Sequence, residues 1–141
     1  MVQIPLFHRH AHPELDEEPL NAHLHVEDRR VYPMQLVLKF VDTGYLISVQ
    51  LSDCLLVGRD SDPMPDIDLS EIDGMKYGIS RMHAAFLYDG RRLAIEDLNS
   101  RNGTRINGFQ IDGGKPYPLH NGDELEIGHL RVIVQLVRAH G

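Results

Sequence analysis

Apolar and polar residues alternate over much of the chain, which is the pattern of β-strands rather than of helices. In the run "YLISVQLS", Ile47, Val49 and Leu51 face one way and the polar residues between them face the other. A period of two residues is typical of a strand that is buried on one side. Residues 35–41, "QLVLKFV", come before this run across the turn "DTG" and predict a neighbouring strand.

The second half of the chain contains three further strand pairs. "HAAFLY" and "RRLAIEDL" flank the turn "DG", and "TRI" and "FQI" flank the turn "NG". Short turns of this kind between strand-like runs are the signal of β-hairpins. "DELEIG" and "LRVIVQLV" predict a final pair around Gly128 and His129. About ten short strands without a convincing helix indicate an all-β sandwich or barrel.

Residues 1–33 have a different composition from the rest of the chain. They contain four of the eight prolines and five of the nine histidines, and no apolar pattern lasts more than a few residues. We therefore predict an N-terminal arm that is Pro/His-rich and flexible. Its clusters "HRHAH" and "HLH" have residues that can ligate a metal ion, but a polar, partly disordered tail is the favoured interpretation. The β domain is expected over residues 34–137, followed by a short tail at 138–141.

Composition and charge exclude several classes of function. With 141 residues the chain is expected to form one domain, and its net charge of −7 argues against a broad basic surface for nucleic acid. No apolar run approaches the roughly 18 residues of a membrane helix. The first residues lack the apolar stretch of a secretion signal, so a cytoplasmic location is predicted.

The single cysteine excludes a disulfide within the chain, which fits a reducing compartment. Cys54 lies in the apolar stretch "DCLLVG" and is predicted to be a small buried residue rather than a nucleophile.

In an acidic chain, any bound anion must be held by a local cluster of cationic side chains. Four loops stand out, namely "VGRD", "GISRMH", "DLNSRNGTRING" and "HNGDELEIG". They supply three arginines, one hydroxyl and one amide: Arg59, Arg81, Arg101, Ser80 and Asn102. Arginine's planar fork matches phosphate with two parallel hydrogen bonds. These loops therefore predict an anion site if the fold brings them together.

Two catalytic or metal-binding alternatives are weaker. Ser80 and His83 are three residues apart and allow a hydrolase dyad, but "GISRMH" is not the strained G-x-S-x-G elbow of such enzymes. The carboxylates of residues 60–71 partly resemble a calcium loop. However, Met64 stands where a ligand is needed and Pro65 where the turn needs glycine. No catalytic residue, metal or cofactor is therefore predicted.

The ordered motifs resemble those of the forkhead-associated (FHA) domain. They are Gly58-Arg59, then Ser80-Arg81-x-His83, then Asn102-Gly103-Thr104 with Asn107-Gly108, and finally Gly122-Asp123. Each motif alone is weak, but the ordered set is specific. With its flanking strands the resemblance covers residues 34–137. It implies an FHA-like β-sandwich of about eleven strands that binds phosphothreonine peptides through loops at one end.

The resemblance also implies roles for individual residues. Arg59 and Ser80 would hold the phosphate, Arg81 would add a phosphate or peptide contact, and Asn102 would bind the peptide backbone beside Arg101. Structural support of the site would come from five residues: Gly58, His83, Gly103, Thr104 and Asn107. The acidic segment 60–78 would influence which peptides bind.

The sequence thus predicts a non-catalytic, phosphothreonine-dependent protein-binding module, an adaptor in Ser/Thr-kinase signalling. The alternative is a β-sandwich that binds its partner without phosphate. Residues 1–33 contain neither serine nor threonine, so the arm cannot supply a phosphorylated ligand for the module's own site. The partner is therefore expected to be a phosphothreonine-containing protein bound in trans, with no nucleic acid and no membrane involved.

Overall fold

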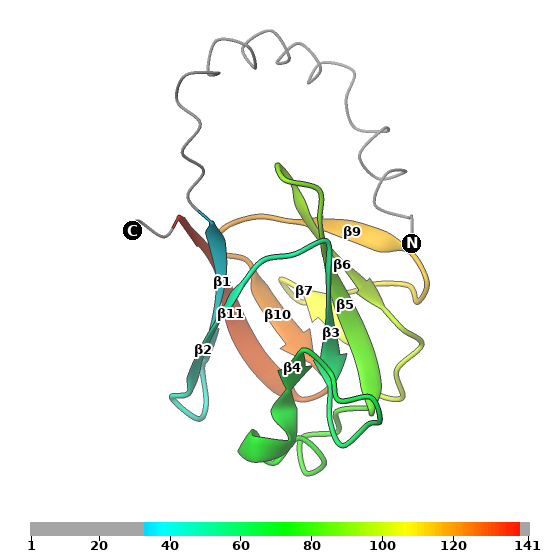
Figure 1. Ribbon diagram of the computed structural model, residues 1–141. Helices are drawn as coiled ribbons and strands as arrows, with labels where there is room; N and C mark the ends of the chain where they lie inside the picture. Colours follow the sequence, from blue (N-terminus) through cyan, green and yellow to red (C-terminus); the bar gives the residue numbers. More distant parts are fainter. Residues whose placement is uncertain (1–32, 139–141) are drawn as a thin grey trace, which may run out of the picture.

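The computed structural model describes residues 33–138 as two β-sheets packed face to face (Figure 1). The predictions for the arm and for the last residues of the tail lie outside this range. Eleven strands are present in the described residues, which confirms the predicted all-β sandwich. Across the same range, no helix has the length and apolar character needed to cross a membrane.

One sheet has six strands in the order β2-β1-β11-β10-β7-β8, and neighbouring strands in it are antiparallel. The predicted "TRI"–"FQI" hairpin and the final strand pair both belong to it and are confirmed. The strands are β1 (Met34–Phe40), β2 (Leu46–Gln50), β7 (Thr104–Ile106), β8 (Phe109–Gln110), β10 (Glu124–Ile127) and β11 (Leu130–Arg138).

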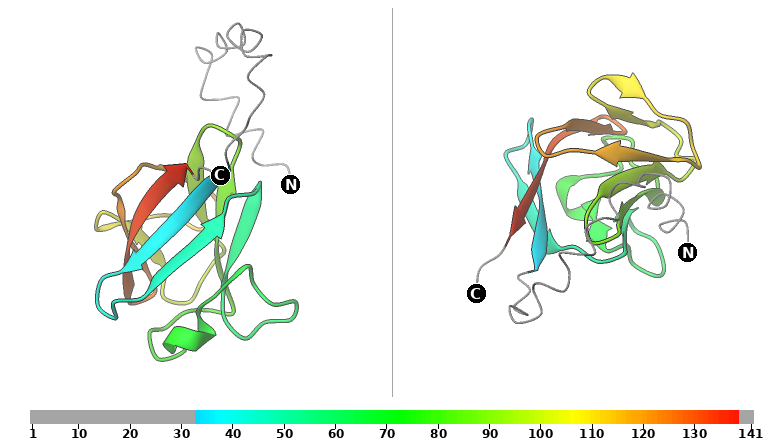
Figure 2. Two further views of the ribbon diagram at one scale, coloured as in Figure 1. Left: turned by 60° about the vertical axis from the view of Figure 1, so that its left-hand side comes forward. Right: turned by 90° about the horizontal axis from the view of Figure 1, so that it is seen from above.

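The other sheet has five strands in the order β4-β3-β5-β6-β9. β5 and β6 form the predicted antiparallel hairpin around the turn "DG", whereas β3 and β4 run parallel. Figure 2 shows the two sheets facing each other from two directions. The strands are β3 (Cys54–Gly58), β4 (Ile67–Asp68), β5 (Met82–Tyr88), β6 (Leu93–Asp97) and β9 (Pro116–Leu119).

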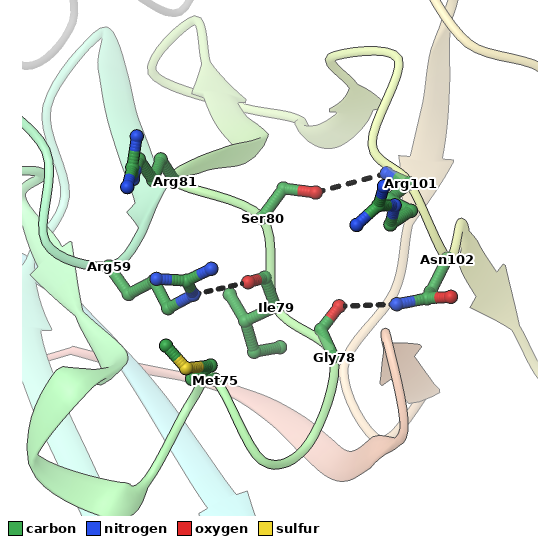
Figure 3. Close-up of a pocket in the computed structure, with 8 residues that line it drawn as sticks. All are labelled: Arg59, Met75, Gly78, Ile79, Ser80, Arg81, Arg101 and Asn102. Carbon is green, nitrogen blue, oxygen red and sulfur yellow. Dashed lines mark hydrogen bonds between the residues drawn. The ribbon is translucent and has the colours of Figure 1, made fainter.

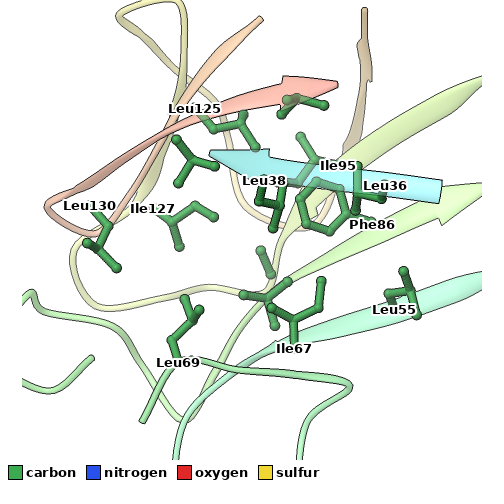
Figure 4. Close-up of a cluster of buried hydrophobic side chains, with 14 of the residues drawn as sticks. Leu36, Leu38, Leu55, Ile67, Leu69, Phe86, Ile95, Leu125, Ile127 and Leu130 are labelled. Atoms are coloured by element: carbon green, nitrogen blue, oxygen red, sulfur yellow. The ribbon is translucent and has the colours of Figure 1, made fainter. Parts of the chain in front are cut away.

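The core lies between the sheets and is built mainly from alternate residues of the longer strands (Figure 4). Leu36 and Leu38 of β1 contribute from one sheet, and Phe86 and Ile95 contribute from the other; all four are 0% exposed. Burial of each such side chain stabilises the fold by about 1.5–3 kcal/mol. This rigid body fixes the positions of the loops at its ends.

The acidic segment 60–78 is more ordered than its composition suggests. It contains β4 and a short 3₁₀ helix, η2 (Leu69–Ile72), whose Leu69 and Ile72 are buried. The Asp68 side chain caps η2 by accepting from Ser70 N at 3.0 Å. Apolar residues spaced among the carboxylates therefore anchor the segment to the core. A two-residue strand and a single helical turn are too short to show a sequence period.

The prediction that Cys54 is buried is wrong, because its side chain is exposed. Cys54 is the first residue of β3, and Leu55 and Val57 take the inward positions on this strand. The apolar neighbours suggested burial, but strand alternation turns Cys54 outward. Partial shielding and the carboxylates of Asp66 and Glu96 raise the pKa of the thiol, which makes it a poor nucleophile.

Candidate anion-binding site

Three of the four predicted loops meet at the end of the sandwich where β3 ends and β5 begins, and they line an open pocket of about 490 Å³ (Figure 3). No residue of the fourth loop, "HNGDELEIG", lies in this lining. The structure brings all five predicted binding residues to the pocket lining, together with three that the sequence did not single out. The lining residues are Arg59, Met75, Gly78, Ile79, Ser80, Arg81, Arg101 and Asn102.

Gly58 allows two of the arginines to come together. A Cβ atom at this position would collide with the backbone carbonyl of Arg81, so a side chain would push the strands apart. The neighbouring Arg59 N donates to that same carbonyl at 3.1 Å. The β3–β5 register also shifts at this point. Glycine is therefore required for the close approach that puts Arg59 beside Arg81.

The Arg59 guanidinium is held by the protein on two sides. Its Nε donates to the Ile79 carbonyl at 2.6 Å, and its NH1 lies 3.2 Å from Asp60 Oδ2. The side chain is only 17% exposed. A guanidinium has five N–H donors, so this arrangement leaves donors for a ligand in the pocket. Figure 3 shows the group beside Ser80 and Arg81.

Ser80 connects two of the pocket loops. Its hydroxyl oxygen accepts from Arg101 N at 3.0 Å, and its own backbone N–H donates to His83 Nδ1 at 3.0 Å. The hydroxyl proton is not used in the bond from Arg101, so it can be donated to an anion.

His83 is fully buried beneath this loop, and both of its ring nitrogens meet backbone groups. Because Nδ1 accepts from Ser80 N, the ring proton belongs on Nε2, which lies 2.9 Å from the Gly103 carbonyl and donates to it. Burial lowers the pKa of His83, which favours this neutral form. With both nitrogens engaged by the backbone, His83 is not placed as the general base of a Ser80 hydrolase dyad.

Asp97 is a structural residue of the site that the sequence reasoning missed. It accepts from the Thr104 hydroxyl at 2.7 Å, from the Ser100 hydroxyl at 2.6 Å and from Ser100 N at 3.0 Å. Burial alone would raise the pKa of Asp97, but the hydrogen bonds from Ser100 and Thr104 outweigh it and lower the pKa. The Asp-x-x-Ser spacing of "DLNS" is a turn signal that could have identified it.

Asn102 joins the same two loops from the other side of the pocket. Its Nδ2 donates to the Gly78 carbonyl at 2.9 Å. Gly78 has φ +74°, and a Cβ atom there would lie 2.6 Å from Asn102 Nδ2. The loops can close only with glycine at this position. The second N–H and the carbonyl oxygen of the amide are further hydrogen-bonding groups for a peptide.

The remaining predicted support residues lie below or beside the pocket. Gly103 and Thr104 are part of the frame around His83 and Asp97. Asn107 lies outside the lining and donates to Asp123 Oδ1 at 3.0 Å, which ties the β7–β8 turn to the turn before β10. The predicted support of the site by Asn107 stays a prediction, because the two turns that it connects do not line the pocket.

The pocket concentrates positive charge at one end of an acidic protein. Arg81 and Arg101 are exposed at its rim, whereas Arg59 is held against the wall. Some carboxylates of the neighbouring acidic segment are used internally, as with Asp66, which accepts from Leu56 N at 2.7 Å. Within residues 33–138, no group of three or more His, Cys, Asp or Glu side chains is arranged to hold a metal ion. This arrangement is suited to a small multivalent anion such as a phosphoryl group.

Comparisons with known proteins point to one family. Residues 55–128 match the family model described as "FHA domain". The chain is 36% identical over 59 residues to the FHA domain-containing protein FhaA of Mycobacterium tuberculosis, covering 42% of this chain and 11% of FhaA. It is 35% identical over 71 residues to the glycogen accumulation regulator GarA of Mycolicibacterium smegmatis, covering 50% of this chain and 40% of GarA. The chain thus spans less than half the length of either relative.

A solved structure is also similar. It comes from a structural and functional analysis of phosphothreonine-dependent FHA domain interactions. It superposes with a TM-score of 0.56 at 29% identity, covering 76% of this chain and 98% of the other. The likeness extends beyond the matched motifs to both sheets.

Proposed function

We propose, since the chain belongs to the FHA domain family, that its pocket binds phosphothreonine in a partner protein. The observation that carries the proposal is the convergence of three arginines, the Ser80 hydroxyl and the Asn102 amide on one pocket. The similar structure was analysed for phosphothreonine-dependent interactions, which supports the same ligand here. The module then acts as an adaptor in Ser/Thr-kinase signalling rather than as an enzyme.

Each group has a role that follows from its position. Arg59 and the Ser80 hydroxyl hold the phosphate, because both are fixed by backbone hydrogen bonds before the ligand arrives. Arg81 and Arg101 add charge from the rim and contact the phosphate or the peptide. Asn102 hydrogen-bonds the peptide backbone with its remaining groups. Such preorganisation reduces the ordering cost of binding.

Phosphothreonine is preferred over phosphoserine in this proposal. The pocket wall includes Met75, whose side chain is 65% exposed and offers apolar surface next to the cationic groups. Burial of one extra methyl group is worth about 0.8 kcal/mol, or about fourfold in affinity. The restricted χ1 of threonine also lowers the entropy cost of binding.

Neither threonine of this sequence is placed to supply the ligand. Thr104 is fully buried and donates to Asp97, so it belongs to the frame and cannot enter the pocket. Thr43 lies in the tight β1–β2 turn, where its Oγ1 accepts from Tyr45 N at 3.2 Å. A client protein phosphorylated in trans is therefore the proposed partner. Cytoplasmic location stays a prediction.

An oriented phosphothreonine peptide library tests the proposal. The full chain should capture phosphothreonine peptides and release them after phosphatase treatment. The alternative, a sandwich that binds without phosphate, retains its ligand after the same treatment. Matched phosphoserine and unphosphorylated peptides are the controls, and equal affinity for all three would contradict the proposal.

A further inference from the structure

The central arginine of the pocket already has an anion beside it. Asp60 Oδ2 lies 3.2 Å from Arg59 NH1, and the side chain of Asp60 is 53% exposed. A phosphate bound by Arg59 would share its guanidinium with this carboxylate. The proposed role of Arg59 does not explain why an acidic residue follows it directly.

Asp60 is held in this position by the acidic segment. Its Oδ1 lies 2.8 Å from Ser70 Oγ, and its backbone N–H donates to the same hydroxyl at 3.1 Å. Ser70 Oγ in turn lies 2.6 Å from Oδ1 of Asp68, the residue that caps η2. The hydrogen bonds to Ser70 and Arg59 lower the pKa of Asp60. The carboxylate is therefore a negative charge held beside the Arg59 guanidinium, although Asp60 itself does not line the pocket.

Asp60 is not the only group that orients Arg59. The guanidinium is anchored through Nε to the Ile79 carbonyl, and the backbone of Arg59 is anchored to the Arg81 carbonyl. Both anchoring carbonyls belong to the 79–81 loop, and Asp60 is not part of that loop. What Asp60 adds at the pocket is therefore mainly charge, and that charge repels an incoming phosphate.

We infer that Asp60 limits the affinity of the pocket by competing with the phosphate for Arg59. The inference rests on the proposed function and concerns the same site. A client peptide must share Arg59 with a carboxylate of the module itself, so its complex dissociates sooner than three arginines alone would allow. Such an internal competitor keeps binding reversible and lets one client be exchanged for another.

Asp60→Asn is the variant that isolates the charge. Asp60 has φ +47°, and asparagine tolerates this left-handed region as well as aspartate does. Its amide oxygen can still accept from Arg59, and its NH₂ can donate to Ser70. Repulsion across one shared guanidinium, screened by solvent, corresponds to about three- to tenfold in affinity. We expect Asp60→Asn to bind a phosphothreonine peptide tighter by that factor in calorimetry.

Asp62→Asn is the matched control. Asp62 is exposed in the same segment, and among the described residues the ion pair of Arg59 is with Asp60 and not with Asp62. Asp62→Asn therefore changes the net charge by the same amount without touching the Arg59 pair. Asp62→Asn should alter the affinity for the phosphothreonine peptide by less than about twofold, because its charge is screened by solvent and salt. An equal gain in both variants would overturn the inference, because net charge alone would then explain it.

Salt dependence separates charge from structure. The advantage of Asp60→Asn over the unmodified chain should shrink as salt rises from 0.05 to 0.5 M, because the repulsion is screened. Unchanged or weaker binding by Asp60→Asn at low salt would overturn the inference while leaving the proposed function intact. If the unmodified chain bound no phosphothreonine peptide, the proposed function would fail and the inference with it.

Discussion

The site consists of two regions that differ in burial and in the kind of bond they make. The frame comprises His83, Asp97 and Thr104, which are 0%, 4% and 0% exposed and bond to backbone and side chains of the loops. The rim comprises Arg81 and Arg101, which are exposed at the pocket. The frame fixes where the loops lie, and the rim supplies charge to whatever enters.

Arg59 and Ser80 connect the two regions. Each faces the pocket yet is held by a backbone group from a neighbouring loop. Changes in the frame should therefore lower stability and binding together, whereas changes at the pocket surface should lower binding alone. This difference can be tested by measuring both quantities for each variant.

The largest expected effect is that of His83→Ala. The change leaves Ser80 N–H and the Gly103 carbonyl without their partner and opens a cavity beneath the loop. We expect a loss of about 3–5 kcal/mol in the free energy of unfolding. The melting temperature should fall by on the order of 10–20 °C. The affinity for a phosphopeptide should fall as well.

Ser80→Ala is the contrasting variant for this test. It removes the hydroxyl but keeps the backbone bond from Ser80 N to His83. It should weaken phosphopeptide binding with little change in melting temperature. An unchanged melting temperature for His83→Ala would instead show that the histidine does not support the loop.

Arg59→Ala should have the next largest effect, and chiefly on binding. Loss of a charge-assisted contact to phosphate should cost about 1.5–3 kcal/mol, which is at least about tenfold in affinity by calorimetry. Arg59→Lys should keep only part of the affinity for the peptide, because an ammonium group cannot reproduce the planar fork of a guanidinium. The free energy of unfolding should fall by no more than about 1 kcal/mol, which is the usual contribution of a hydrogen bond such as the one to Ile79.

Arg91→Ala controls for net charge. Arg91 is exposed at the β5–β6 turn, at the opposite end of the sandwich from the pocket (Figure 1). It should leave affinity nearly unchanged. If Arg59→Ala bound phosphothreonine peptide as well as Arg91→Ala did, the phosphate would have to bind elsewhere.

The two regions also differ in how far the sequence predicts them. The hairpins around "DG" and "NG" were predictable because turn residues and strand alternation are local signals. The pocket residues were predictable from the arginine-bearing loops, but their roles in binding a phosphothreonine peptide were predictable only through the ordered FHA motifs. Asp97 has a local signal in its Asp-x-x-Ser spacing, but its bond to Thr104 depends on the fold. Asp60 was read as part of an acidic stretch, since its contact with Ser70 crosses ten residues.

The smallest expected effect is a pH dependence of stability that belongs to the frame. Burial lowers the pKa of His83 in the folded protein, while the unfolded chain has the ordinary value of about 6.5. Above that pH both states are neutral and the full stability is present. As pH falls below it, the unfolded chain takes up a proton that the folded protein does not. Stability is then lost at up to about 1.4 kcal/mol per pH unit, until the folded pKa is reached.

Urea unfolding at pH 7.5 and 5.5 measures this slope, and His83→Ala identifies its source. The other histidines are common to both proteins, so the variant should lose less stability between the two pH values. Asp97 does not interfere, because its lowered pKa keeps it ionised in both states over this window and its contribution is lost only in stronger acid. Equal slopes in the two proteins would mean that His83 accepts a proton in the folded state as readily as in the unfolded chain. The description of His83 as a neutral ring that bridges Ser80 and Gly103 would then be wrong.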